Sequence, residues 1–448
     1  MAVRLPFSPS RPRADFYLFT PHETAMYART LRRLFGIVSR RTSGTATPVS
    51  ARGRLNEHQH GGFMSASRSR RRILASAGGL LLATAARLAP AAAREQIVNI
   101  GFAGGFGVKL QSNLSFGARD GALLAVEEAN QRNIVIGGKP VRFALLVVDD
   151  QSEPNFARIA ANSFVAANVS GVIGHNTTDT SVAATPIYAE AGIPQISPTS
   201  TGRSFTSRGY RNVFQLLGHS DITANHLADI TEQTIRARRV AVLDNATQLG
   251  QSLAEGYIAR LRQAGMTIVA RESVGGKSSD FSATLARIKA ANPDLMFFTA
   301  VGPQVVALVQ SHQRMGLDCK LLATGGGVNL EFPRTGLYPD GSYVLLHGLQ
   351  VERRPGYAEF EKNYRRKYES ALTAYTMFSY DAVGMLIDAM RRVDSTDPKL
   401  LTAELHRMQY RGISGPIAFA ADGSQVNPPY TLYRAARDIW QQARTFGG

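Results

Sequence analysis

The chain has almost no cysteine and no long apolar run, and both absences exclude a class of structure. Cys319 is the single cysteine of 448 residues, so no disulfide can form within the chain and no thiol near the amino terminus could carry a lipid. The apolar stretch at 73–82 is well short of the ~20 residues that a membrane-spanning helix needs. Short tandem repeats, low-complexity tracts and heptads are also lacking after residue 93. These absences leave a globular protein without a membrane span.

Lysine is missing from the first 93 residues, although the whole chain has a net charge of +17. Residues 1–93 hold 15 arginines against three acids, which leaves 36 basic and 31 acidic residues for 94–448. The larger part of the chain is therefore only mildly basic, and it shows no basic stripe with interleaved aromatics. Nucleic acid is excluded as a partner on this pattern.

The segment 64–93 has the three-part layout of an export signal. It reads "MSASRSRRRILASAGGLLLATAARLAPAAA", with a basic start, a modest apolar stretch and an alanine-rich end suited to signal peptidase. The letters "SRRRIL" at 69–74 resemble the twin-arginine variant of such signals. Residues 1–63 have no periodicity and precede a second methionine, so we interpret them as a disordered extension or an upstream start. A real targeting extension remains the alternative. We expect an exported, soluble, periplasmic product.

From residue 97 onward, apolar strands alternate with amphipathic helices, which predicts an α/β protein. The alternation restarts near residue 219, so two similar halves are expected, with a cleft between them. The first half contains strands at 98–104, 141–150, 171–174 and 192–197, and the second at 240–244, 267–270, 294–298, 320–324 and 342–346.

Hydroxyl groups gather at one predicted strand-to-helix junction, "IGHNTTDTSVAA" at 173–184. In parallel α/β sheets, ligands bind beyond the carboxyl ends of strands, where helix N-termini offer free amide hydrogens. A helix cap would account for one of these residues. It does not account for four, nor for the similar "ISPTSTGRSF" after the next strand. The junction therefore predicts a site for an anionic oxygen pair.

These motifs resemble the leucine/isoleucine/valine-binding family of periplasmic solute-binding proteins, the receptors of ABC importers. The matching stretches, in order, are "GHNTTDTSVAATPIYAEAGIPQISPTSTGRSFTSRGY", "DFSATLARIKAANPDLMFF", "YTMFSYDAVGML" and "GPIAFAADG". The resemblance covers about 97–435. It implies a type I periplasmic binding protein fold, with two doubly wound parallel-sheet lobes joined by three crossovers around a central cleft. Lobe one would comprise 97–217 plus 349–411, and lobe two 218–348 plus 412–440.

The resemblance also implies a set of ligand-binding positions. The carboxylate-binding hydroxyl falls on Thr178, with Asn176 and Thr177 in the same turn, while Thr199 would offer a carbonyl to an ammonium and Thr201 a hydroxyl to both groups. In the second lobe, the aromatics that cover the ligand in the family fall on Leu249 and Val301, and the ammonium-binding glutamate falls on Gly325.

The glycine at position 325 leaves a ligand ammonium without its acid. Either Asp179 or Glu331 supplies the counter-charge, or the ligand has no ammonium. Arg203, next to the second loop, favours the second alternative by adding positive charge near the carboxylate. A small carboxylate with an apolar tail is therefore the first hypothesis for the ligand, and an apolar amino acid the second.

A non-enzymatic receptor is expected, because no pairing of nucleophile and base and no set of metal ligands emerges from the spacing. No cofactor is expected, and the partners would be the ligand and an inner-membrane ABC permease, with the protein a monomer. A ligand sensor for a signalling receptor is the alternative. We interpret Ser220 as a helix N-cap, and His175 and His347, which flank buried strands, as hydrogen-bonded core residues.

Overall fold

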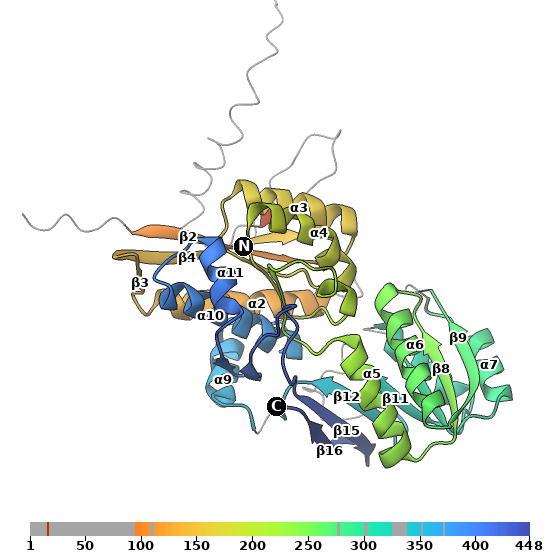
Figure 1. Cartoon of the computed structure of the whole chain (residues 1–448). Coiled ribbons are helices and arrows are strands. Elements are labelled where there is room, and N and C mark those ends of the chain that lie inside the picture. Colours follow the sequence, from red (N-terminus) through yellow and green to blue (C-terminus); the bar gives the residue numbers. More distant parts are fainter. Residues whose placement is uncertain are drawn as a thin grey trace, which may run out of the picture. The chain divides into compact units, whose positions relative to one another are not determined.

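Two mainly parallel sheets organise the chain in a computed structural model (Figure 1). The structure describes residues 16–17, 95–107, 112–275, 278–299, 303–324, 338–350, 353–370 and 372–448. The predicted export signal at 64–93, and nearly all of 1–63, lie outside these ranges. Among the described residues, no helix is both long enough and apolar enough to cross a membrane.

The first sheet has the strand order β1-β4-β2-β5-β6-β7, with the short β3 paired to β4. Neighbours from β4 to β7 run parallel, while β1 and β3 are antiparallel to β4. The chain passes from β2 to β4 on one side and then returns to β5 on the other, so the strand order reverses between β2 and β5. The strands are β1 (Phe16–Tyr17), β2 (Gln96–Gly104), β3 (Val135–Ile136), β4 (Lys139–Asp149), β5 (Val172–Ile173), β6 (Gln195–Ser197) and β7 (Val213–Gln215).

Helices cover both faces of the first sheet because its central strands are apolar on both sides. Side chains alternate along β2, so Ile100 and Phe102 enter one core while Ala103 enters the other. The first core lies under α2 (Ser112–Asn130), α10 (Ala374–Arg392) and α11 (Pro398–Leu405), and the second under α3 (Pro154–Ala166) and α4 (Thr178–Ala191).

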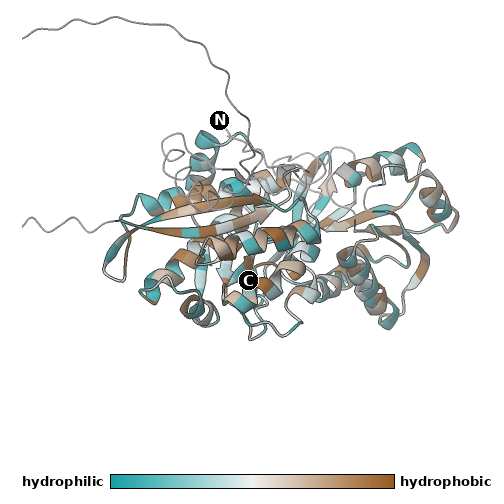
Figure 2. Cartoon of the chain, turned by 90° about the horizontal axis from the view of Figure 1, so that it is seen from above, coloured by the Kyte–Doolittle hydropathy of each residue, from teal (hydrophilic) through white to brown (hydrophobic). Residues whose placement is uncertain are grey.

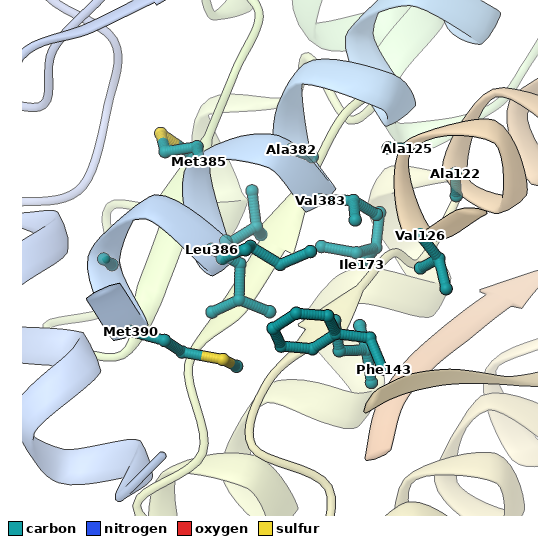
Figure 3. Packing of buried hydrophobic residues seen from close by; sticks show 14 of the residues in the cluster. Ala122, Ala125, Val126, Phe143, Ile173, Ala382, Val383, Met385, Leu386 and Met390 are labelled. Carbon is teal, nitrogen blue, oxygen red and sulfur yellow. The ribbon is translucent and has the colours of Figure 1, made fainter. Parts of the chain in front are cut away.

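The larger of these two cores joins segments that are far apart in the sequence. Figure 3 shows Leu386 and Met390 of α10 beside Phe143 of β4, with Ile173 of β5 close to Val383. Figure 2 shows the long strands mainly in the hydrophobic colour, whereas the helices carry residues of both kinds. The helix pair α2 and α10 is therefore held to the sheet mainly by burial of apolar side chains.

The second sheet repeats this plan with the order β16-β15-β12-β11-β10-β8-β9. Strands from β12 to β9 are parallel neighbours, and β15 and β16 add an antiparallel edge. The order reverses between β8 and β10. The strands are β8 (Arg239–Asp244), β9 (Thr267–Ser273), β10 (Leu295–Phe298), β11 (Lys320–Thr324), β12 (Tyr343–His347), β15 (Tyr430–Ala436) and β16 (Ile439–Phe446).

The helices of the second sheet also lie on two faces. Val240 and Val242 of β8 join a core with α5 (Ser220–Asp229) and α6 (Gln248–Gln263), while Ala241 and Leu243 join one with α7 (Ser282–Ala290) and α8 (Pro303–Arg314). A short π-helix, η2 (Ile230–Ile235), follows α5. Both halves thus have the predicted α/β layout, and each predicted strand in them has a counterpart.

The chain passes between the two sheets three times. It leaves the first sheet after β7, returns after β12 to α9 (Tyr357–Lys367), and crosses again before β15. The third crossing lies near residue 428 rather than at the expected 412, because Ile417 and Phe419 belong to the first core. Ser424 also forms a bridge with Gln215 of β7. The hairpin of β13 (Tyr410–Gly412) and β14 (Gly415–Ile417) precedes this crossing.

Candidate ligand-binding site

A cavity of about 240 Å³ lies at the carboxyl ends of strands from both sheets. Its walls include the loops that follow β5, β8 and β10, which flank the two points where the strand order reverses, and the loop after β6, the neighbour of β5. Ligands of open α/β sheets bind at such points, because the loops there diverge and leave a crevice. The first residues of α4, α5 and α6 also line the cavity. Three helix N-termini therefore contribute partial positive charge.

Two threonines of the first loop cap helix α4. The side chain of Thr177 accepts a hydrogen bond from the backbone N–H of Thr180, and the Thr180 hydroxyl bonds back to Thr177, which completes a capping box. Capping thus explains two members of the hydroxyl cluster, one more than expected. Thr178, the first residue of the helix, keeps its hydroxyl proton for another acceptor, because its oxygen accepts from the Gly202 N–H at 3.0 Å.

Hydrogen bonds join the two hydroxyl-rich loops to each other. Thr199 donates from Oγ1 to the backbone carbonyl of Asn176 at 2.8 Å, and Ser200 donates to the carbonyl of Thr177 at 3.1 Å. Thr201 shows no side-chain hydrogen bond among the described residues, while its carbonyl accepts from the Ser220 N–H. The five positions expected in this lobe, from Asn176 to Thr201, all line the cavity. Of their hydroxyls, those of Thr178 and Thr201 have capacity left for a ligand.

Two oxygen acceptors in the first loop are buried and unpaired. Oδ1 of Asn176 and Oδ1 of Asp179 have no hydrogen-bond partner in the described part of the chain, and both residues line the cavity. Burial raises the pKa of the Asp179 carboxyl above its ordinary value. Buried acceptors without partners cost free energy, so this arrangement favours a ligand that brings hydrogen-bond donors. Asp179 is also the single carboxylate on the described cavity wall, and no lysine or arginine lines it.

Arg203 does not supply charge to this cavity. Its guanidinium donates to Asp422 at 2.8 Å and to the Thr206 hydroxyl at 2.6 Å, and the residue is not part of the cavity wall. The expectation that Arg203 adds positive charge near a ligand carboxylate is therefore wrong. The reason is tertiary: Asp422 arrives from the turn before the third crossing, more than 200 residues away in the sequence.

The second lobe contributes a polar wall with two leucines. Asn245, which follows β8, accepts from the Thr247 hydroxyl at 2.7 Å, and Thr247 caps α6 by accepting from the Gly250 N–H at 3.0 Å. Leu249 lies on the wall, as the resemblance implied, together with Leu253. Val301, Gly325 and Glu331 lie outside the described residues.

Several residues of the cavity wall were not predicted from the sequence. Asn245 and Thr299 directly follow predicted strands, so the rule that located the first loop could have found them. Ser115, Thr223 and Tyr375 had no such signal, because their helices reach the cavity through tertiary packing. Ser220 does not cap α5, since it is the first helical residue; its hydroxyl accepts from the Arg203 N–H at 3.4 Å.

The two histidines that were interpreted as core residues differ. His175 is fully buried and bonded at both ring nitrogens, to Asp150 at 2.7 Å and Tyr188 at 3.0 Å, so that interpretation is confirmed. His347 is half-buried, lines the cavity, and has no partner for Nδ1 among the described residues. The interpretation of His347 as a hydrogen-bonded core residue is wrong, because its strand ends at the cavity.

Comparison with known proteins places this architecture. A family model described as periplasmic binding protein matches residues 97–438. A Leu/Ile/Val-binding protein homolog 1 of Brucella suis is 28% identical over 327 residues, which are 72% of this chain and 86% of that protein. A leucine-, isoleucine-, valine-, threonine- and alanine-binding protein of Pseudomonas aeruginosa is 24% identical over 322 residues, covering 71% and 85%.

Solved structures agree on the fold. A branched-chain amino acid transporter substrate-binding protein of Streptococcus pneumoniae, in complex with isoleucine, matches with a TM-score of 0.69 at 21% identity, covering 79% of this chain and 99% of that one. A solute-binding protein of R. palustris, in complex with 4-hydroxybenzoate, also reaches 0.69, at 18% identity over 79% and 97%. The predicted type I fold is thereby confirmed. The chain belongs to the periplasmic binding protein family, a class of non-enzymatic receptors for small solutes.

Proposed function

We propose that the protein captures a small amino acid by closing its two lobes over the cavity, and delivers it to an ABC permease in the inner membrane. The observation that carries this proposal is the pairing of a donor-rich turn with an unpaired acid. Thr178 and the N-terminus of α4 can bind a carboxylate, and Asp179, the next residue, has a buried oxygen that finds no partner among the residues the structure describes. These two features match the two charged groups of an amino acid.

The charge of Asp179 supports a ligand that carries an ammonium group. Asp179 is half-buried, and its partial removal from water without a counter-charge raises the pKa of its carboxyl. A ligand ammonium would relieve this cost through charge-assisted hydrogen bonds, each worth about 1.5–3 kcal/mol. Asp179 thus takes the role that the family's glutamate has at position 325. A carboxylate without ammonium would leave Asp179 unpaired next to a second negative charge, so it becomes the second hypothesis.

Closure of the two lobes is favoured when both of them contact the same ligand. A ligand anchored on the first lobe that also contacts Leu249 and Asn245 of the second lobe binds the closed form better than the open one. This differential affinity shifts the population toward the closed state, which the permease recognises. The protein acts in the periplasm as an exported monomer.

Calorimetry with three matched ligands tests the proposal. Leucine carries both charged groups, 4-methylpentanoate lacks the ammonium, and leucinamide lacks the carboxylate. We expect leucine to bind and each truncated ligand to bind about 10-fold to 150-fold more weakly, the equivalent of about 1.5–3 kcal/mol. Protein freed of bound solutes by unfolding and refolding is the sample, and benzoate is added as a fourth ligand because relatives of this fold bind benzoates.

Two results contradict the proposal in different ways. If 4-methylpentanoate or benzoate binds at least as tightly as leucine, the ligand has no ammonium and Asp179 has another role. If a wide panel of amino acids and small carboxylates gives no heat of binding, the cavity does not bind this class of solute.

A further inference from the structure

His347 occupies a special position at the junction of the lobes. It is the last residue of β12, directly before the second crossing, and its side chain lines the cavity. The ring packs against Tyr430, the first residue of β15, with ring centroids 4.6 Å apart. Tyr430 is fully buried, and its hydroxyl bonds to Thr223 of α5 at 2.9 Å. The imidazole therefore packs on a tyrosine ring whose own position is fixed by a hydrogen bond to α5.

The imidazole is uncharged and has an unused polar atom. Burial lowers the pKa of His347 to about 3, with the nearby His226 adding to the effect, so the ring is neutral at physiological pH. Nδ1 is buried and has no hydrogen-bond partner in the described part of the chain. Leaving a buried polar atom unpaired is unfavourable, because the atom has lost its hydrogen bond to water and gained none in the protein. A ligand group that satisfies this nitrogen would remove the cost, whereas a methyl group would keep it.

The surroundings of His347 are also polar. Thr324 ends the adjacent strand β11, and Thr299 follows the next strand, β10, so two hydroxyls line the same cavity from neighbouring strand ends. A ligand whose charged groups are held at Thr178 and Asp179 leaves its tail for the remaining walls. A hydroxyl on that tail suits either tautomer of His347, because it both donates and accepts.

We propose that His347 is a specificity-determining residue that selects ligands carrying a hydroxyl group on the tail. This inference rests on the proposed function, since it assumes that the cavity binds a small carboxylate-bearing solute. In this arrangement the strand ends of the second lobe contact the ligand's tail, and the first lobe binds its charged end. Sites built to bond a hydroxyl reject analogues that lack it, because the protein's own polar atoms are then left unpaired.

Ligand pairs that differ by one hydroxyl test the inference by calorimetry: valine and threonine, phenylalanine and tyrosine, benzoate and 4-hydroxybenzoate. In the native protein, we expect the hydroxylated member of at least one pair to bind about 10-fold more tightly, the equivalent of ~1.4 kcal/mol. His347→Phe keeps an aromatic ring against Tyr430 but has no nitrogen, so the preference within that pair should fall to near one. His347→Asn offers a donor and an acceptor and should retain part of the preference.

The ratio of two affinities for one variant is the decisive readout, because a merely structural effect of the substitution weakens both ligands alike. The inference is overturned if no pair shows a preference in the native protein, or if His347→Phe leaves the preference intact. If His347→Phe does not fold, His347→Val or His347→Ala takes its place. An unchanged preference for the hydroxylated ligand in that variant also overturns the inference. If none of the six ligands binds although leucine does, this inference is overturned while the proposed function stands; if leucine also gives no heat of binding, the proposed function fails as well.

Discussion

Replacing Thr178 by valine should separate ligand binding from folding at the first loop. The hydroxyl of Thr178 accepts from the Gly202 N–H at 3.0 Å, and the residue is 4% exposed. Valine leaves that N–H buried without a partner, which costs about 1–3 kcal/mol of unfolding free energy. It also removes the proton that Thr178 can donate to a ligand carboxylate. A hydrogen bond to a charged group contributes about 1.5–3 kcal/mol, so leucine affinity should fall about 10-fold to 150-fold.

Thr185→Val is the matched control for this prediction. Thr185 lies on the same helix, is 1% exposed, and bonds to Ser181 and Gln195 at 2.8 Å, but it does not line the cavity. Both variants should lose a similar amount of stability in urea unfolding followed by circular dichroism. Calorimetry at a temperature where both are folded should show weakened leucine binding for Thr178→Val alone. Equal affinities for the two variants would refute the assignment of Thr178 to the ligand.

Three further predictions follow from the first lobe. Leucine affinity should decrease as the pH is lowered through the raised pKa of Asp179, because protonation removes the charge that pairs with the ammonium. In calorimetry, Asp179→Asn should bind leucine more weakly at pH 7 and should lose this pH dependence. Without ligand, Asp179→Asn should increase the urea midpoint at pH 7. The cost of burying the carboxylate is absent below the ordinary pKa of 3.8, grows as the pH rises from there to the raised folded-state pKa, and is fully present above it. A lower midpoint would contradict this. Gly202→Ala should weaken leucine binding, because a Cβ there would collide with the side chain of Thr178. The control Gly121→Ala should leave leucine affinity unchanged and cost about 1–3 kcal/mol of stability, because its Cβ would press α2 against the Thr376 carbonyl of α10.

The sequence predicted the fold well because its signals are local. Alternation of apolar strands with amphipathic helices is written into successive residues, and Ile100, Phe102 and Ala103 show why: a central parallel strand must be apolar on both faces. The third crossing was misplaced because nothing local to Ile417 and Phe419 indicates which of the two cores their side chains join. Its partner, Phe214 of β7, is about 200 residues earlier.

At the candidate site, too, some features follow from local sequence and others from tertiary contacts. The sequence alone determined that a donor-rich turn follows a buried strand at Asn176–Thr178, since turn composition and helix-capping residues are adjacent in the chain. Only the tertiary structure decided which of those groups remain free for a ligand. Thr199 and Ser200 bond to the neighbouring loop, and Arg203 forms an ion pair with Asp422. Within the described ranges, Asp179 and His347 each keep one atom without a hydrogen-bond partner. The physical reason is that a polar atom becomes available only when no partner lies within hydrogen-bonding distance, and those partners come from distant parts of the chain.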